Sequence, residues 1–142
     1  MSSRPELKVD DEHGFIRFFK SLPVVDDDVV RIFDRGDWYT AHGEDANFIA
    51  RTVYKTTSVV RQLGRNDSTG LPSVTMTVTV FRQFLREALY KLGKRVEIWA
   101  SPNGRMNWKI VKQASPGNLQ DVEEDLGSLS EAAPIILARI SR

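Results

Sequence analysis

Several features are missing from this chain of 142 residues, and each absence narrows its possible functions. It contains no cysteine, which excludes disulfide bonds, thiol catalysis and cysteine-ligated zinc and is typical of a reducing compartment. No apolar run reaches the roughly 18 residues that a membrane-spanning helix needs. The N-terminus lacks the apolar core of a secretory signal. With 41% hydrophobic and 27% charged residues, the composition indicates a folded domain of ordinary size.

Residues for catalysis are also scarce. The only histidines are His13 and His42. His42 lies near Asp37 and Glu44, which leaves a metal-dependent nuclease as one hypothesis, to be revived by Mg²⁺-dependent cleavage. Glu44 is better explained as a negative charge at a helix N-terminus, and no GxxxxGK[ST] phosphate-binding loop is present. We therefore expect no catalytic residue, no metal site and no cofactor in this chain.

The formal net charge of +1 conceals a strong pattern. Residues 1–50 carry a net charge of −5, residues 51–112 carry +9 and residues 113–142 carry −3. A basic block between two acidic ones indicates a surface that faces a polyanion such as nucleic acid. The alternative is that these lysines and arginines only solvate helix faces and strand edges.

Hydrophobic periodicity predicts a mixed order of helices and strands. Helices are predicted over about residues 10–20, 44–54, 81–92 and a short stretch from 118. Strands are predicted over 29–33, 38–42, 58–63, 74–79, 95–100 and 106–112. Thr79 is the expected cap of the third helix, residues 64–72 the expected flexible loop, and the acidic run 26–28 an expected solvated loop. Short hairpin links beside helical crossovers predict an α/β fold of the α+β type, with a mixed sheet of about six strands flanked by about four helices.

The last residues suggest a domain boundary. The continuous apolar run 134–140 (PIILARI) is typical of a strand that is covered on both faces, but few partners remain for it. We expect one domain over residues 1–127, followed by a linker and the first strand of a further domain over 128–142.

A binding signal lies in the turn that joins the first two predicted strands. Trp38 and Tyr39 follow Arg35, Gly36 and Asp37 directly. Neighbouring strand residues point to opposite faces, so one aromatic ring is expected in the core and the other at the surface. A surface ring beside basic residues could stack on a base or wedge between two bases. The alternative is that both rings pack inside.

The segment 32–46 (IFDRGDWYTAHGEDA) resembles the N-terminal, mismatch-binding domain of the MutS family of mismatch-repair proteins. Residues 4–8, 93–98 and 114–118 agree with the same family, and in particular with the subunit type that is common to the MutS-alpha and MutS-beta heterodimers. The resemblance implies the MutS domain I fold and a nuclear location. It implies as partners double-stranded DNA with mispairs or insertion/deletion loops, a second MutS-homologue subunit and MutL-type proteins. ATP and Mg²⁺ would belong to other parts of a longer protein, and 134–140 would begin its connector domain.

One departure from the family bears on mechanism. Mismatch-reading members carry a Phe-Xaa-Glu motif after the Gly-Asp pair, but here Trp38 replaces the Phe and Thr40 the Glu. An aromatic ring survives while the carboxylate that bonds to the mispaired base is lost. The predicted role is therefore DNA contact and support, without mispair reading. The candidate DNA-binding residues are Arg35, Trp38, Tyr39, Thr40, Lys55, Arg61 and Arg65. The alternative is a protein-interaction or spacing module, for which the basic residues Arg82, Arg86 and Lys91 would form an exposed helix face.

Overall fold

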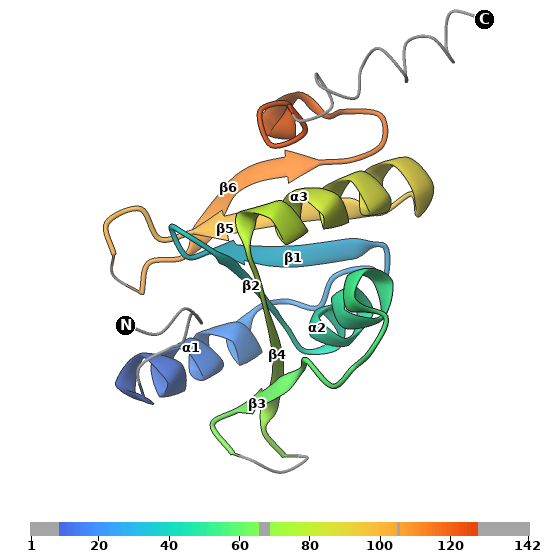
Figure 1. Cartoon of the computed structure of the whole chain (residues 1–142). Coiled ribbons are helices and arrows are strands. Elements are labelled where there is room, and N and C mark those ends of the chain that lie inside the picture. The colour runs from blue at the N-terminus through green and yellow to red at the C-terminus, as the bar shows by residue number, and fades with distance from the viewer. Residues whose placement is uncertain (1–8, 66–68, 105, 128–142) are drawn as a thin grey trace, which may run out of the picture.

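The computed structural model describes residues 9–65, 69–104 and 106–127, so the predicted linker and strand over 128–142 lie outside the described residues. Within them, six strands form one mixed sheet in the order β3-β4-β2-β1-β5-β6 (Figure 1). The strands are β1 (Val29–Asp34), β2 (Tyr39–His42), β3 (Arg61–Leu63), β4 (Leu71–Met76), β5 (Arg95–Ala100) and β6 (Lys109–Ala114). The predicted fold class is confirmed.

Three helices cover the sheet. Helix α1 (Val9–Ser21) lies on one face, while α2 (Glu44–Ile49) and α3 (Val78–Arg86) lie on the other (Figure 1). A wider, π-type helical segment extends each of the last two, η1 (Ala50–Tyr54) after α2 and η2 (Glu87–Lys91) after α3. Among the described residues, no helix has the length and apolar character needed to cross a bilayer.

Strand pairing brings two loops to the same end of the sheet. Strands β1 and β5 run parallel, from Val29 opposite Arg95 to Asp34 opposite Ala100. Because both strands end together, the turn 35–38 after β1 emerges beside residues 101–104 and 106–108, which follow β5 (Figure 1). All other strand pairs are antiparallel.

The two faces of the sheet have different cores. The face under α2 and α3 is mainly aliphatic and includes Ile32, Ala41 and Ile98. The face under α1 is aromatic, because alternate residues of β1, β2 and β5 point to it. Its rings belong to Phe15, Phe18, Phe19, Phe33, His42, Trp99 and Trp108. Neighbouring rings meet at centroid distances of 4.5–6.1 Å, within the range of favourable aromatic pairs.

Some predicted boundaries were wrong. Strand β4 covers Leu71–Met76 and not 74–79, because Ser73 pairs with His42 and Met76 with Tyr39. Helix α3 consequently starts at Val78, and its cap is Thr77, whose hydroxyl accepts a hydrogen bond from the Val80 N–H at 3.2 Å.

Three further elements differ in length or place. The predicted strand 58–63 shrinks to β3, since β4 offers it partners only for Arg61–Leu63. The predicted strand 106–112 moves to β6, which pairs with β5 as far as Ala114 and contains an irregularity opposite Ile98 and Trp99. The expected fourth helix is the single 3-10 turn η3 (Gln120–Val122).

Candidate nucleic-acid interface

The turn between β1 and β2 has a closed geometry. The Arg35 N–H donates to the Trp38 carbonyl at 2.8 Å, and the Gly36 N–H donates to the Asp34 carboxylate at 2.8 Å. Gly36 has φ +98°, a left-handed backbone that favours glycine. The turn therefore presents Asp37 and Trp38 at the end of the sheet in one defined conformation.

The two aromatic residues of this turn differ in burial. The Tyr39 side chain is in the core, 9% exposed, with its ring stacked on Phe81 at 3.7 Å between centroids. This burial, aided by Asp34, raises the pKa of Tyr39 to about 12. Trp38 is half-buried at the surface. Of the two rings, only that of Trp38 is therefore placed to meet a ligand.

The buried Thr40 and the half-buried Arg35 belong to one hydrogen-bond network. Thr40 is 2% exposed and accepts a hydrogen bond from Arg35 Nε at 3.0 Å, while His42 Nε2 lies 3.0 Å from the same hydroxyl. Burial, with the nearby Arg35 charge, holds the pKa of His42 well below its ordinary value, so the ring is neutral. The predicted DNA contacts of Tyr39 and Thr40 therefore do not fit this fold, since both side chains face inward.

The nuclease hypothesis gains no geometric support. His42 is enclosed by the rings of Phe15, Phe19 and Phe33. Within the described ranges, no group of three His, Asp or Glu side chains is placed to hold a metal ion.

The basic middle block is partly neutralised by the acidic ends of the chain. Arg95 bonds to Asp26 at 3.2 Å and to Asp28 at 3.0 Å, and Lys112 bonds to Asp125 at 3.1 Å. The hydrogen bond from Arg95 lowers the pKa of Asp28. The acidic run 26–28, predicted as a solvated loop, thus holds the start of β5. The charges of Arg95 and Lys112 are thus partly neutralised by aspartates of the same chain.

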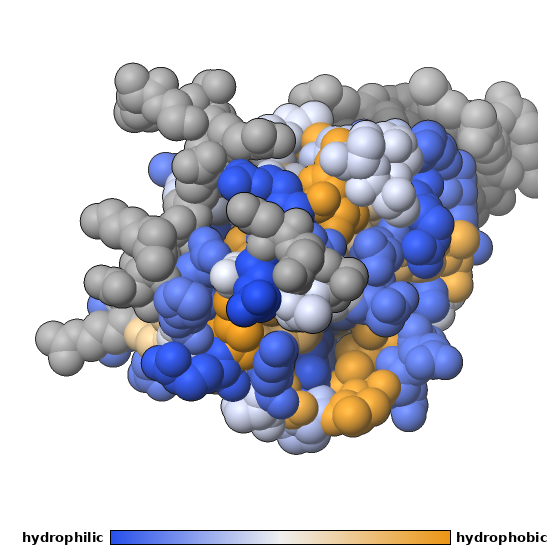
Figure 2. Space-filling view, turned by 90° about the horizontal axis from the view of Figure 1, so that it is seen from below, coloured by the Kyte–Doolittle hydropathy of each residue, from blue (hydrophilic) through white to orange (hydrophobic). Residues whose placement is uncertain are grey.

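The three basic candidates lie elsewhere, on the β3 side of the sheet. Lys55 is exposed at the end of η1 and has φ +61°. Arg61 is exposed on the edge strand β3, and Arg65 is exposed in the loop that follows. The structure therefore places all three at the surface but not beside Trp38. Seen from this side, hydrophilic side chains surround separate hydrophobic areas, with no broad apolar face in view (Figure 2).

Two further cations lie in the acidic first block, where the charge pattern gave no sign of them. Arg17 and Lys20 are exposed on α1, three residues apart and therefore neighbours on the helix surface. In the part of the chain that the structure describes, no ion pair reaches either of them. Their helical spacing on the polar side of α1 was a signal present in the sequence.

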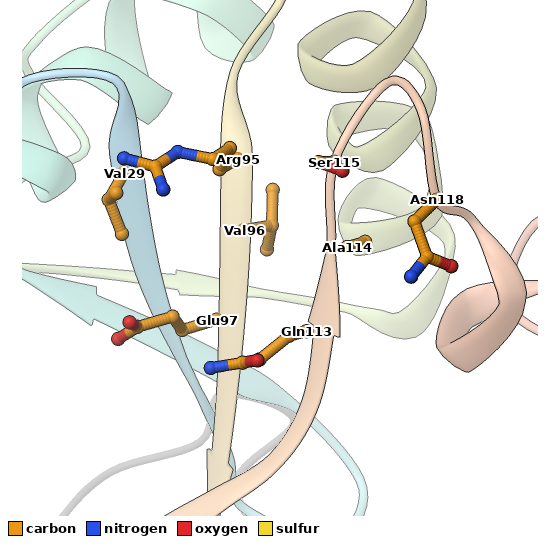
Figure 3. A pocket seen from close by; sticks show the side chains of 8 residues that line it. All are labelled: Val29, Arg95, Val96, Glu97, Gln113, Ala114, Ser115 and Asn118. Atoms are coloured by element: carbon orange, nitrogen blue, oxygen red, sulfur yellow. The ribbon is translucent and has the colours of Figure 1, made fainter.

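Two hollows on the described part of the surface are candidates for a small-molecule site. One of about 210 Å³ lies between β1, β5 and the end of β6 (Figure 3). Its charged lining residues are already engaged, since Arg95 bonds to two aspartates and Glu97 bonds to Arg31 at 3.3 Å. A larger hollow of about 570 Å³, near the start of α2, mixes basic with acidic side chains. Neither offers the one-signed charge that would select a charged ligand.

Comparison with known proteins identifies the family. Residues 13–123 match the model of MutS domain I. This chain belongs to the MutS family. "DNA mismatch repair protein msh-2" of Neurospora crassa is 83% identical to it over 138 residues, which are 97% of this chain and 15% of that protein. The proteins named MSH2 in Arabidopsis thaliana and Saccharomyces cerevisiae are 40% and 35% identical, over 94% and 98% of the chain and 14% and 15% of their own lengths.

The region that matches MutS domain I coincides with the sheet. The MutS domain I match begins in α1 and ends just after η3, so it contains the whole sheet. The chain spans about 15% of the length of the first relative.

Proposed function

We propose that this MutS domain I is a non-enzymatic, DNA-contacting domain of a mismatch-repair protein. It touches duplex DNA near mispairs or insertion/deletion loops and supports recognition without reading the mispair. The observation that carries the proposal is the β1–β2 turn of a MutS domain I, which leaves Trp38 at the surface and buries Thr40.

Thr40 is the reason for assigning support and not mispair reading. Mispair reading in the family is expected to use a carboxylate at this position. A hydroxyl that is 2% exposed and already bonded to Arg35 offers a base neither charge nor access. Trp38 retains a ring that can stack on a base or wedge into a base step, which is tolerant of sequence.

Cations supply the second part of the contact. Lys55, Arg61 and Arg65 remain the candidates for phosphate contact, and we add Arg17 and Lys20 of α1. Such contacts release counterions, so they bring salt dependence but no sequence preference.

The wider setting is also a proposal. The domain would act in the nucleus within a heterodimer of two MutS-homologue subunits, in contact with MutL-type proteins. ATP and Mg²⁺ would bind elsewhere in the longer protein. The relatives carry the name of DNA mismatch repair proteins.

Salt-dependent DNA binding tests the cation assignment. We expect this chain to bind a fluorescein-labelled duplex with an unpaired loop, measured by anisotropy at several salt concentrations. Arg61→Ala with Arg65→Ala should weaken binding and reduce the slope of log K against log salt by about 0.9 for each phosphate that the two arginines neutralise. The matched control is Lys91→Ala, because Lys91 already pairs with Glu87 at 3.7 Å. An unchanged slope in the double variant would contradict the assignment of Arg61 and Arg65.

A second candidate function is a protein-interaction or spacing module. The observation in its favour is a group of exposed apolar side chains on or next to the edge strand β6, namely Met106, Ile110 and Val111. Deleting the domain from the heterodimer separates the two functions. Full retention of loop binding without the domain would favour the spacing role.

A further inference from the structure

Arg35 contacts three segments that are far apart in the sequence. Its guanidinium carbon lies 4.5 Å from the ring centroid of Phe15 in α1 and 4.8 Å from that of Trp108 in the loop before β6. Its Nε donates to Thr40 in β2 at 3.0 Å. A planar guanidinium can place its faces against aromatic rings while its edge donates hydrogen bonds, which an ammonium cannot do.

Trp108 lies in the loop that precedes β6, and it also contacts other aromatic residues. The Trp108 ring also packs edge-on against Phe15 at 5.8 Å and Phe33 at 5.5 Å. The loop has its own bonds, since the Gly104 N–H donates to the Ser101 carbonyl at 2.9 Å and the Asn107 N–H to the Ser101 hydroxyl at 3.2 Å. The Arg35–Trp108 contact therefore joins the turn 35–38 to a segment in which Gly104 and Asn107 are bonded to Ser101.

The joined elements emerge at one end of the sheet. Asp34 pairs with Ala100, and Ala100 with Lys109, so the turn with Trp38 lies next to the loop with Met106. Trp38 is half-buried, Met106 is 42% exposed and Lys109 is exposed. This edge thus carries an aromatic ring, a flexible apolar side chain and a cation.

The geometry points to Arg35 as a positioning residue that holds the turn 35–38 and the loop around Trp108 together as one DNA-contacting edge. This inference rests on the proposed function, because it names the surface through which Trp38 meets DNA. Arg35 itself does not touch the DNA. It sets the place of Trp38 through the backbone of the turn, which is tied to the sheet while the guanidinium packs against the adjoining rings of Phe15 and Trp108.

A double-mutant cycle tests whether Arg35 acts through Trp38. Affinity for the looped duplex is measured for wild type, Arg35→Ala, Trp38→Ala and the double variant. We expect each single variant to lose about tenfold, within the range for loss of a base–aromatic stack, and the double variant to lose about tenfold and not a hundredfold. Arg35→Lys, which keeps the charge but not the planar stack, should behave like Arg35→Ala.

Three results would overturn the inference. Wild-type affinity in Arg35→Ala would show that the contact has no role, and wild-type affinity in Arg35→Lys would show that only the charge matters. Losses that multiply in the double variant would show that Arg35 acts apart from Trp38.

The control is Phe84→Leu, a core change on the opposite face of the sheet, which should lower the melting temperature and leave the affinity unchanged. An equal loss of affinity in this control would reduce the effect of Arg35 to general destabilisation.

If the wild-type chain binds no DNA, the proposed function is contradicted. Amide hydrogen exchange then still tests whether Arg35 joins the turn to the loop. In Arg35→Lys, exchange should accelerate at the amide of position 35 in the turn and at the Asn107 amide of the loop, while amides of α3 keep wild-type rates. Unchanged exchange in the loop would show that Arg35 does not join the two elements.

Discussion

At the scale of single residues, Arg31 connects three parts of the chain through hydrogen bonds. Its side chain donates to Glu97 at 3.3 Å and to the Pro23 carbonyl at 2.7 Å, while its backbone N–H donates to Asp45 at 3.0 Å. Asp45 lies in the first turn of α2, where a carboxylate suits the helix dipole. Burial of the carboxylate raises its pKa more than the helix dipole and the nearby Arg31 lower it, so the pKa of Asp45 is raised to about 6.

Asp45→Asn should reveal this raised pKa as a pH-dependent stability difference. The folded protein holds the proton more tightly than the unfolded chain, whose aspartate pKa is about 3.9. The contribution of protonated Asp45 to the free energy of unfolding is therefore complete below about pH 4, and it is lost as the pH rises through about 6. Asparagine keeps an acceptor for the Arg31 N–H and has no such loss.

The measurement is urea unfolding of both proteins at several pH values. Between pH 4 and pH 7, the difference in unfolding free energy should move in favour of the Asp45→Asn variant by roughly 2 kcal/mol. His42 also titrates, but it is present in both proteins and cancels in the difference. A difference that stays constant with pH would show that Asp45 has an ordinary pKa.

At the scale of elements, α3 shows how a helix can be predicted correctly while its start is not. Phe81, Phe84 and Leu85 follow helical spacing and are fully buried. The predicted start was wrong because Val74–Thr79 alternates apolar and polar residues as a strand would. Two threonines two residues apart are both plausible caps, and the chain direction after Met76 decides between them.

Substitution of the two threonines tests the cap directly. Thr77→Ala should lower the free energy of unfolding by about 1 kcal/mol, because the Val80 N–H loses its side-chain acceptor. Thr79→Ala is the matched control, since Thr79 is exposed within the helix and should change stability by less than about 0.5 kcal/mol. Both values come from chemical denaturation. Equal losses would mean that the Thr77 hydroxyl does not cap α3.

At the scale of the whole molecule, the segment after β6 returns to cover the sheet. Val122 and Leu126 are buried in the aliphatic core, and Asp125 pairs with Lys112. The segment also bonds to the edge of β6, since Asp121 accepts from the Gln113 N–H at 3.0 Å. Residues 115–126 therefore pack with the sheet, although the only helical element in them is the 3-10 turn η3.

Substitution of one leucine measures how much this segment contributes to the free energy of unfolding. Leu126→Ala should cost about 2–4 kcal/mol, because it removes a side chain that is 4% exposed. The matched control is Leu92→Ala, where the side chain is 43% exposed and the cost should stay below about 1 kcal/mol. Thermal or urea unfolding of both variants gives the comparison. A cost for Leu126→Ala as small as the control would place the segment outside the cooperative unit.

The sequence by itself determined the fold class and the place of several elements, although not the bounds of β3, β4, β6 and α3. Spacing of apolar residues is a local property, so α1, β1, β2 and β5 followed from periodicity. The different burial of Tyr39 and Trp38 did not follow from it, because the alternative that both rings pack inside stayed open. Family membership could likewise be inferred from the segment 32–46, and the comparisons confirm it.

Only the tertiary structure decided which side chains are available at the surface. The charge blocks could not show that Arg95 and Lys112 are held by aspartates from distant segments, while Arg17 and Lys20 face outward. The sequence also could not show that Arg35 packs against the adjoining rings of Phe15 and Trp108 and donates a hydrogen bond to Thr40. Such contacts join residues that lie far apart in the sequence, and only the pairing of β1 with β5 and the packing of α1 on the sheet bring them within reach.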